Sequence, residues 1–166
     1  MSLSDLRYRI RQLRRSLRPV VTHNDQIEAR RILGDRLYPL FDSMQSADQR
    51  HCLDVYGKLI ASGCTDAEVL QTALIHDAGK GRLAGARFGV WHRVAYVGLE
   101  HTPRLLDRLA RHNRGLGSLH AHSRKTIDLA REYGASDGIL HLLTEMGSSS
   151  PSEERARLLK AMDDRS

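Results

Sequence analysis

The stretch Gln71-Thr72-Ala73-Leu74-Ile75-His76-Asp77-Ala78-Gly79-Lys80 decides how this chain folds. It is an apolar helical run that ends in a histidine and an aspartate side by side, and a glycine and a lysine follow at once. Aspartate is almost never fully buried unless it is paired or bound to a metal. Because Asp77 comes directly after apolar positions, the end of this helix is predicted to be a functional site.

A second predicted helix precedes this one. Ser46-Ala47-Asp48-Gln49 has the pattern of a capping box and predicts a helix over about 46–61, which Gly63 ends. Thr65-Asp66-Ala67-Glu68 is a second capping box and predicts the start of the helix that contains the quoted stretch.

Only a few residues join these two helices, so they are expected to pack antiparallel. The start of one then lies beside the end of the other. His51 is near the start of the first helix, and His76 and Asp77 are at the end of the second. The three side chains are therefore predicted to lie close together.

Asp163 is a fourth candidate, in the last predicted helix. Ser150-Pro151-Ser152-Glu153 combines a serine cap, a proline at the first helical position and a glutamate at the third, and predicts a helix over about 150–164. Ala156, Leu159 and Asp163 fall on one face of that helix. The carboxylate of Asp163 is therefore also expected on an apolar face.

Two imidazoles and two carboxylates, from His51, His76, Asp77 and Asp163, form a mixed nitrogen and oxygen set that suits a divalent metal ion. They leave positions on the ion for water and for substrate oxygens. Such an ion lowers the pKa of bound water and shields phosphoryl oxygens, which suits hydrolysis of a phosphate ester. The alternative is that the two histidines are ordinary core residues and the two aspartates are helix caps. This explanation has to hold at all four positions at once.

The rest of the chain is also predicted to be helical, because no useful period-2 alternation and no internal repeat occurs. We expect one all-α bundle of about eight or nine helices. Residues 1–43 would form a basic helical segment on or beside the core, and residues 44–166 the metal-binding domain. Asn24 or Asp25 is expected to cap the second helix, and Pro39 to interrupt it. The expected helices span about 1–19, 24–38, 46–61, 65–77, 90–99, 102–112, 119–133, 136–143 and 150–164.

The chain carries a formal net charge of +6 and has a pI near 9.7. Residues 1–19 hold six arginines against one acid, with leucines at helical spacing, which predicts an amphipathic basic helix. Such a helix most often packs its apolar stripe on the domain and exposes its arginines. Contact with nucleic acid or an anionic membrane surface is the alternative. A basic protein also suits an anionic substrate.

No apolar run approaches the roughly 18 residues that span a bilayer, and the N-terminus lacks the apolar region of a signal peptide. We therefore expect no membrane span and a cytoplasmic protein. Cys52 and Cys64 lack the spacing of a metal site and are expected to be small, reduced apolar side chains. The oligomeric state has no signal in the sequence.

Three segments together resemble the signature of the HD-domain metal-dependent phosphohydrolases. They are Arg50-His51, the run from Ala73 to Lys80, and Leu158-Leu159-Lys160-Ala161-Met162-Asp163-Asp164. The resemblance covers roughly residues 44–166 and implies an all-helical fold with a His…His-Asp…Asp metal site. It implies that the metal ligands are His51, His76, Asp77 and Asp163. It also implies that Lys80 contacts phosphate near the metal.

His122 resembles the auxiliary histidine that some members of this family carry on a later helix. Gly134 follows it twelve residues on, as in those members, but Ser123 stands where they have a proline. Many relatives also place further histidines downstream, where this chain has Glu145 and Met146. The resemblance therefore implies one ion rather than two. The Gly-Tyr-Pro signature of the cyclic-dinucleotide branch is absent from the sequence.

The function implied is a metal-dependent hydrolase of a phosphoester in a small phosphorylated compound, such as a nucleotide. One divalent ion (Mn, Mg, Fe, Co, Ni or Zn) would hold a phosphate oxygen, and its bound water would attack phosphorus. Lys80 and nearby arginines would neutralise phosphoryl charge, and His122, or an acid reached through water, is a candidate for proton transfer. Two alternatives stay open. One is a catalytically weak HD-fold module that binds metal and ligand for regulation, and the other is a nucleic-acid binder that uses the helix around residues 7–18.

Overall fold

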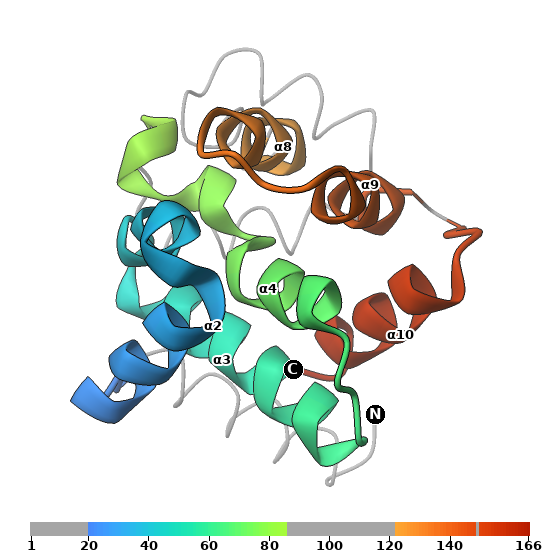
Figure 1. The fold of residues 1–166 in the computed structure, drawn as a ribbon, viewed down its shortest axis with the longest axis horizontal. Coiled ribbons are helices and arrows are strands. Elements are labelled where there is room, and N and C mark those ends of the chain that lie inside the picture. The colour runs from blue at the N-terminus through green and yellow to red at the C-terminus, as the bar shows by residue number, and fades with distance from the viewer. Residues whose placement is uncertain (1–19, 86–121, 149) are drawn as a thin grey trace, which may run out of the picture.

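The structure is a computed structural model and describes residues 20–85, 122–148 and 150–166. Every element in these ranges is helical, as expected for an all-α protein (Figure 1). The α-helices are α2 (His23–Asp42), α3 (Ser46–Ala61), α4 (Ala67–Ile75), α8 (His122–Glu132), α9 (Asp137–Met146) and α10 (Glu154–Asp163). Two 3-10 helices, η1 (Ala78–Lys80) and η2 (Arg82–Ala84), follow α4. The helices expected over 1–19, 90–99 and 102–112 lie outside the described residues.

Helix α4 lies at the centre of the described fold. It is apolar on nearly every side, which is the pattern of a helix enclosed by others. In Figure 1 it lies between α2 and α3 on one side and α9 and α10 on the other, and it packs against all four. Its buried residues are Val69, Leu70, Thr72, Ala73, Leu74 and Ile75. The side chains that follow α4 therefore emerge inside the bundle.

The core consists of two groups of buried side chains around α4. One group joins α2, the end of α4, α8 and α9 around residues such as Phe41 and Ile75. The other joins α3, the first part of α4, α9 and α10 around Leu59 and Leu159. Because both groups include α4, the last turn of α4 is held in place from both sides.

Helices α3 and α4 form the predicted hairpin. Gly63, with φ +84°, follows the end of α3, and the two helices pack side by side. The predicted caps are wrong, because Gln45 and Asp66 occupy the N-cap positions in place of Ser46 and Thr65. The carboxylate of Asp66 accepts hydrogen bonds from two backbone N–H groups in the first turn of α4.

The side chains expected to complete those capping boxes have long-range partners instead. The amide of Gln49 donates to the carbonyl oxygen of Phe41. The carboxylate of Glu68 accepts hydrogen bonds from Ser136 and Arg155. These partners join α3 to α2 and α4 to α9 and α10, so they contribute to tertiary structure rather than to the ends of their own helices.

The start of the last helix is also predicted wrongly. Helix α10 begins at Glu154, three residues later than the Ser150 cap implied. The carboxylate of Glu145, at the end of α9, accepts hydrogen bonds from the backbone N–H groups of Ser152 and Glu153. These N–H groups are therefore satisfied without a helix over residues 150–153.

Helix α2 is capped by Thr22, not by Asn24 or Asp25. Thr22 and Asp25 bond each other's backbone N–H group, which is a reciprocal capping box. The break in this helix lies at Gly34, with φ 65° and ψ 174°, and not at Pro39, which lies within the helix. Gly34 rather than Pro39 interrupts the helix, because this backbone conformation is essentially restricted to glycine.

Gly34→Ala is expected to lower the free energy of unfolding by about 1–3 kcal/mol, because alanine is strained in this conformation. Nothing lies within 4 Å of the position that its Cβ would take, so crowding does not contribute. Gly57, inside α3, has the same open surroundings and is the matched control. Gly57→Ala should raise the free energy by about 0.5–1 kcal/mol. Urea unfolding measures both, and equal stability of the two variants would contradict the conformation of Gly34.

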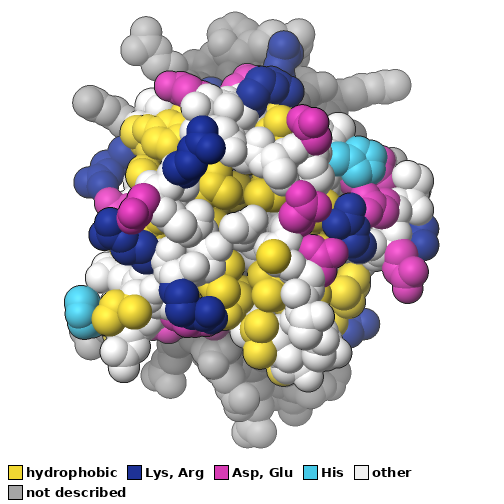
Figure 2. Space-filling view, in the orientation of Figure 1, with side chains coloured by type: hydrophobic (Ala, Val, Ile, Leu, Met, Phe, Trp, Pro, Cys, Tyr) yellow, Lys and Arg dark blue, Asp and Glu magenta, His cyan; other side chains and the backbone are white. Residues whose placement is uncertain are grey.

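The described surface carries charges of both signs. Figure 2 shows Lys and Arg side chains interspersed with Asp and Glu over the face in view. Acids outnumber Lys and Arg among the described residues, so the positive charge of the chain comes from residues 1–19 and 86–121. In the part of the chain that the structure describes, no helix combines the length and the apolar character needed to cross a membrane.

Candidate metal centre

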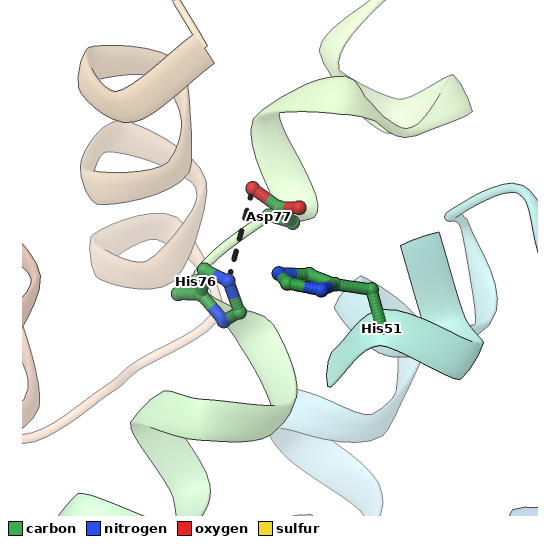
Figure 3. A group of neighbouring side chains, drawn as sticks. All are labelled: His51, His76 and Asp77. Atoms are coloured by element: carbon green, nitrogen blue, oxygen red, sulfur yellow. Dashed lines mark ion pairs between the residues drawn. The ribbon is translucent and has the colours of Figure 1, made fainter. Parts of the chain in front are cut away.

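Three side chains converge at the end of α4 (Figure 3). His51 projects from the second turn of α3, while His76 caps the C-terminal end of α4 and Asp77 follows it. One ligand atom of each residue lies within 4.8 Å of the others. The two imidazole rings meet edge to face, with centroids 5.3 Å apart. His51, His76 and Asp77 could therefore hold a metal ion.

Asp163 joins this group from the last turn of α10. Its Oδ1 lies 2.8 Å from Nε2 of His51 and 3.5 Å from Nε2 of His76. Helix α10 packs against α3, α4 and α9, which brings this carboxylate to the end of α4. All four residues that the sequence nominated as ligands thus lie together in the structure.

Hydrogen bonding turns one nitrogen of His76 toward the group. Its Nδ1 donates to the carbonyl oxygen of Ala73, 2.9 Å away. Its Nε2 is buried, lies 3.5 and 3.9 Å from carboxylate oxygens of Asp163 and Asp77, and makes no hydrogen bond among the described residues. Buried polar atoms rarely lack a partner. A histidine whose other nitrogen bonds a backbone carbonyl is typical of a metal ligand, so His76 fits one.

The spacing of the donor atoms fits the same interpretation. Metal bonds of about 2.0–2.2 Å to nitrogen and oxygen place neighbouring ligands about 3 Å apart. Three separations between a histidine nitrogen and a carboxylate oxygen of the group are 2.8, 3.5 and 3.9 Å. Two imidazoles with two carboxylates suit a divalent ion of hard or borderline character. The residues present therefore fit the ion that the sequence implied.

The charges of the group shift the pKa values of its members. Burial acts to raise the pKa of Asp77, but Lys80 and the neighbouring histidines lower it well below its ordinary value. The pKa of Asp163 is also far below its ordinary value, because His51 and His76 outweigh the effect of burial. Burial acts to lower the pKa of His76, but Cys52, Asp77 and Asp163 together hold it well above 6.5. The site therefore keeps both carboxylates ionised and favours positive charge at His76.

Metal affinity is expected to rise with pH, because the ion must displace the proton of His76. The protonated ring of His76 stabilises the metal-free protein, and this stabilisation is fully present at pH values below the ordinary histidine pKa of 6.5. It is lost as the pH rises through the higher pKa that His76 has in the folded protein. The two carboxylates act in the opposite sense, since their contribution is lost as the pH falls below 3.8. Calorimetry in buffers of different ionisation enthalpy should show release of about one proton per ion. Affinity that is constant from mildly acidic to mildly basic pH would contradict this.

Lys80 is directed at Asp77. Its Nζ lies 2.7 Å from Oδ2 of Asp77, while Oδ1 of the same carboxylate lies 3.9 Å from His76 and 3.8 Å from His122. One oxygen of Asp77 thus holds the lysine, and the other faces the histidines. Contact between Lys80 and phosphate stays a prediction. The structure adds that this ammonium group orients a candidate ligand.

Lys80→Met is expected to weaken divalent-metal binding by about 10-fold, as for other groups that orient a ligand. Methionine keeps the unbranched apolar part of the side chain, with one atom fewer, and removes the donor to Oδ2 of Asp77. Calorimetric titration of the metal-stripped variant with Mn²⁺ measures the loss. If the variant kept the wild-type affinity and lost only affinity for phosphate compounds, Lys80 would be a substrate contact and not an orienting group.

A cavity of about 180 Å³ lies beside the four candidate ligands. Leu143, Met146 and Gly147, at the end of α9, form another part of its wall. Neither Leu143 nor Met146 offers a ligand for a second hard ion. The site residues that line it are His51, His76, Asp77, Lys80, His122 and Asp163. The six residues predicted for metal binding and catalysis therefore share one cavity.

Sequence reasoning gave three residues near this site no part in its chemistry. Ser123 and Thr126, on α8, line the cavity. Cys52 contacts the ring of His76, with its Sγ 3.7 Å from Nδ1 of His76. Thr126 is one helical turn after His122, and that spacing was the available signal. Burial raises the pKa of the Cys52 thiol, so it is the neutral, apolar side chain that was expected. Both cysteines are free.

Comparison of the chain with models of known protein families, with curated proteins and with solved structures gave no match. The functional interpretation of this site therefore depends on its side chains and distances, together with the resemblance in the sequence.

Proposed function

We propose that this chain is an HD-type hydrolase of a phosphoester in a small phosphorylated compound, with one divalent ion held by His51, His76, Asp77 and Asp163. The observation that carries the proposal is the buried Nε2 of His76, which has two carboxylates beside it and makes no hydrogen bond among the described residues. Asp77 is buried and Asp163 is partly exposed, and two carboxylates this close together favour positive charge between them. A set of core histidines and caps does not need this arrangement.

A bound divalent ion supplies charge stabilisation to phosphoryl oxygens and lowers the pKa of coordinated water. Lys80 holds Asp77 so that Oδ1 faces the histidines, and its ammonium adds positive charge at the cavity wall. His122 lines the same cavity, with Nε2 3.8 Å from Asp77. From this position its imidazole can give a proton to a departing oxygen.

The cavity supports a small anionic substrate. Its volume of about 180 Å³ is below the roughly 300–1,000 Å³ of pockets for drug-sized ligands. Histidines and Lys80 can donate hydrogen bonds to phosphoryl oxygens, while Leu143 and Met146 can contact an apolar part of the leaving group. Nucleoside phosphates and simple phosphate esters are the classes to test first.

Phosphate release from a panel of these compounds tests the proposal. The metal-stripped protein is reloaded separately with Mn²⁺, Mg²⁺, Co²⁺ and Zn²⁺. Metal-dependent turnover is expected in the wild type and in Asp164→Asn, and its loss is expected in Asp163→Asn. Asp164 is the matched control, because it follows Asp163 directly and is exposed. Equal turnover in both variants would contradict the proposed role of Asp163.

A regulatory module that binds metal and an anionic ligand without turnover is the second candidate. Leu143 and Met146 favour it, because they place groups that cannot transfer a proton on the cavity wall. Metal-dependent binding of phosphate compounds, with no phosphate release from any member of the panel, would select this alternative.

A further inference from the structure

Thr126 joins the segments that carry the site. It lies one turn after His122 in α8 and is 1% exposed. Its hydroxyl oxygen accepts a hydrogen bond of 2.8 Å from the backbone N–H group of Gly79. The same oxygen lies 3.1 Å from the carbonyl oxygen of His76 and 3.0 Å from that of His122, and its hydrogen can be donated to either. One hydroxyl group thus contacts the backbone of the turn and of α8.

The turn that contains Gly79 lies directly against the first turn of α8. A Cβ atom on Gly79 would be 2.0 Å from the carbonyl oxygen of His122 and 2.8 Å from the hydroxyl oxygen of Thr126. No side chain fits in that space, so backbone approaches backbone here. The buried N–H group of Gly79 needs a partner at this contact, and Thr126 supplies it.

We propose that Thr126 is a positioning residue, whose hydroxyl group fixes His122 relative to His76 and Asp77. The roles of the residues that it positions rest on the proposed function, whereas the hydrogen bonds that position them do not. Without the hydroxyl group, the N–H of Gly79 loses its partner and the turn is free to move away from α8. The separation between His122 and the ligands is then no longer fixed.

A second buried threonine provides a matched control. Thr72, in α4, is 0% exposed and donates to the carbonyl oxygen of Glu68, four residues earlier, at 2.7 Å. Thr126 has the same relation to His122. Thr72 does not line the cavity. Thr72→Val therefore removes a buried helical hydroxyl group of the same kind without a change at the site.

Three variants test the proposal: Thr126→Val, Thr126→Ser and Thr72→Val. Each metal-stripped protein is titrated with Mn²⁺ by calorimetry, and hydrogen exchange at the Gly79 amide is followed by NMR. Thr126→Val is expected to weaken Mn²⁺ binding by about 10-fold, as for the loss of other outer-shell partners, and to speed exchange at Gly79. Thr126→Ser should restore both properties, because it keeps the hydroxyl group. Thr72→Val should change neither.

The two measurements separate this proposal from the proposed function. If the wild type binds no Mn²⁺ but Thr126→Val still speeds hydrogen exchange at the Gly79 amide, the proposed function is wrong and the positioning role of Thr126 stands. Unchanged exchange at Gly79 and unchanged Mn²⁺ affinity in Thr126→Val would overturn the positioning role. Equal weakening by Thr72→Val would also overturn it, since general destabilisation would then explain the effect.

Discussion

The Asp77→Asn protein is expected to bind Mn²⁺ at least about 100-fold more weakly than the wild type, because loss of a ligand exceeds the 10–100-fold loss for an outer-shell group. Asparagine keeps the shape of the side chain and removes its charge. Asp77 is 3% exposed and lies between His76, His122 and Lys80, so no solvent-exposed acid can replace it. Calorimetric titration and the metal content of the purified protein measure the loss.

The same substitution should destabilise the metal-free protein. It leaves the ammonium group of Lys80 and the ring of His76 without their shared counter-charge. Removing one partner of a buried ion pair costs about 3–5 kcal/mol, and the lower end applies because Lys80 is partly exposed. Asp128→Asn is the control, since Asp128 forms an exposed pair with Arg131 in α8 and should contribute little. Asp77→Asn with wild-type Mn²⁺ affinity would remove Asp77 from the ligand set.

Gly79→Ala is expected to disrupt the site and to lower the free energy of unfolding by about 3 kcal/mol or more, the upper range for overpacking. The new Cβ would lie 2.0 Å from the carbonyl oxygen of His122. That atom belongs to backbone and cannot rotate away, so the turn and α8 must separate. Separation breaks the hydrogen bond between Gly79 and Thr126 and moves His122 away from Asp77.

Urea unfolding and Mn²⁺ titration measure both effects of Gly79→Ala. Gly57→Ala is the control for a glycine-to-alanine change, because nothing lies within 4 Å of its new Cβ. A Gly79→Ala protein as stable as Gly57→Ala, with unchanged Mn²⁺ affinity, would contradict the close contact between the turn and α8.

The arrangement of the candidate ligands could be predicted because it depends on local signals. Apolar periodicity places α3 and α4, and the short connection between them places His51 beside His76 and Asp77. Asp163 could be nominated because it ends a helix whose apolar face carries Ala156 and Leu159, both fully buried. In each case the signal lies within a few turns of the residue concerned.

Helix starts and the contacts of the site could not be predicted, because they depend on partners far along the chain. Glu68 has the spacing of a capping residue, but it binds Ser136 and Arg155 on other helices. The resemblance implies that Lys80 contacts phosphate, which stays a prediction, but no local signal indicated that its ammonium group holds Asp77. The role of Thr126 depends on the close approach of α8 to a turn that lies 47 residues earlier. Sequence spacing within α8 places Thr126 one turn after His122, but it carries no information about that approach.

Anomalous diffraction from crystals of the Mn²⁺-loaded protein, recorded near the manganese edge, tests the central claim most directly. We expect one strong peak per chain, coordinated by Nε2 of His51, Nε2 of His76, Oδ1 of Asp77 and a carboxylate oxygen of Asp163. Crystals that contain Mn²⁺ with no peak at these four residues, or with the peak elsewhere on the chain, would contradict the assignment of the metal centre.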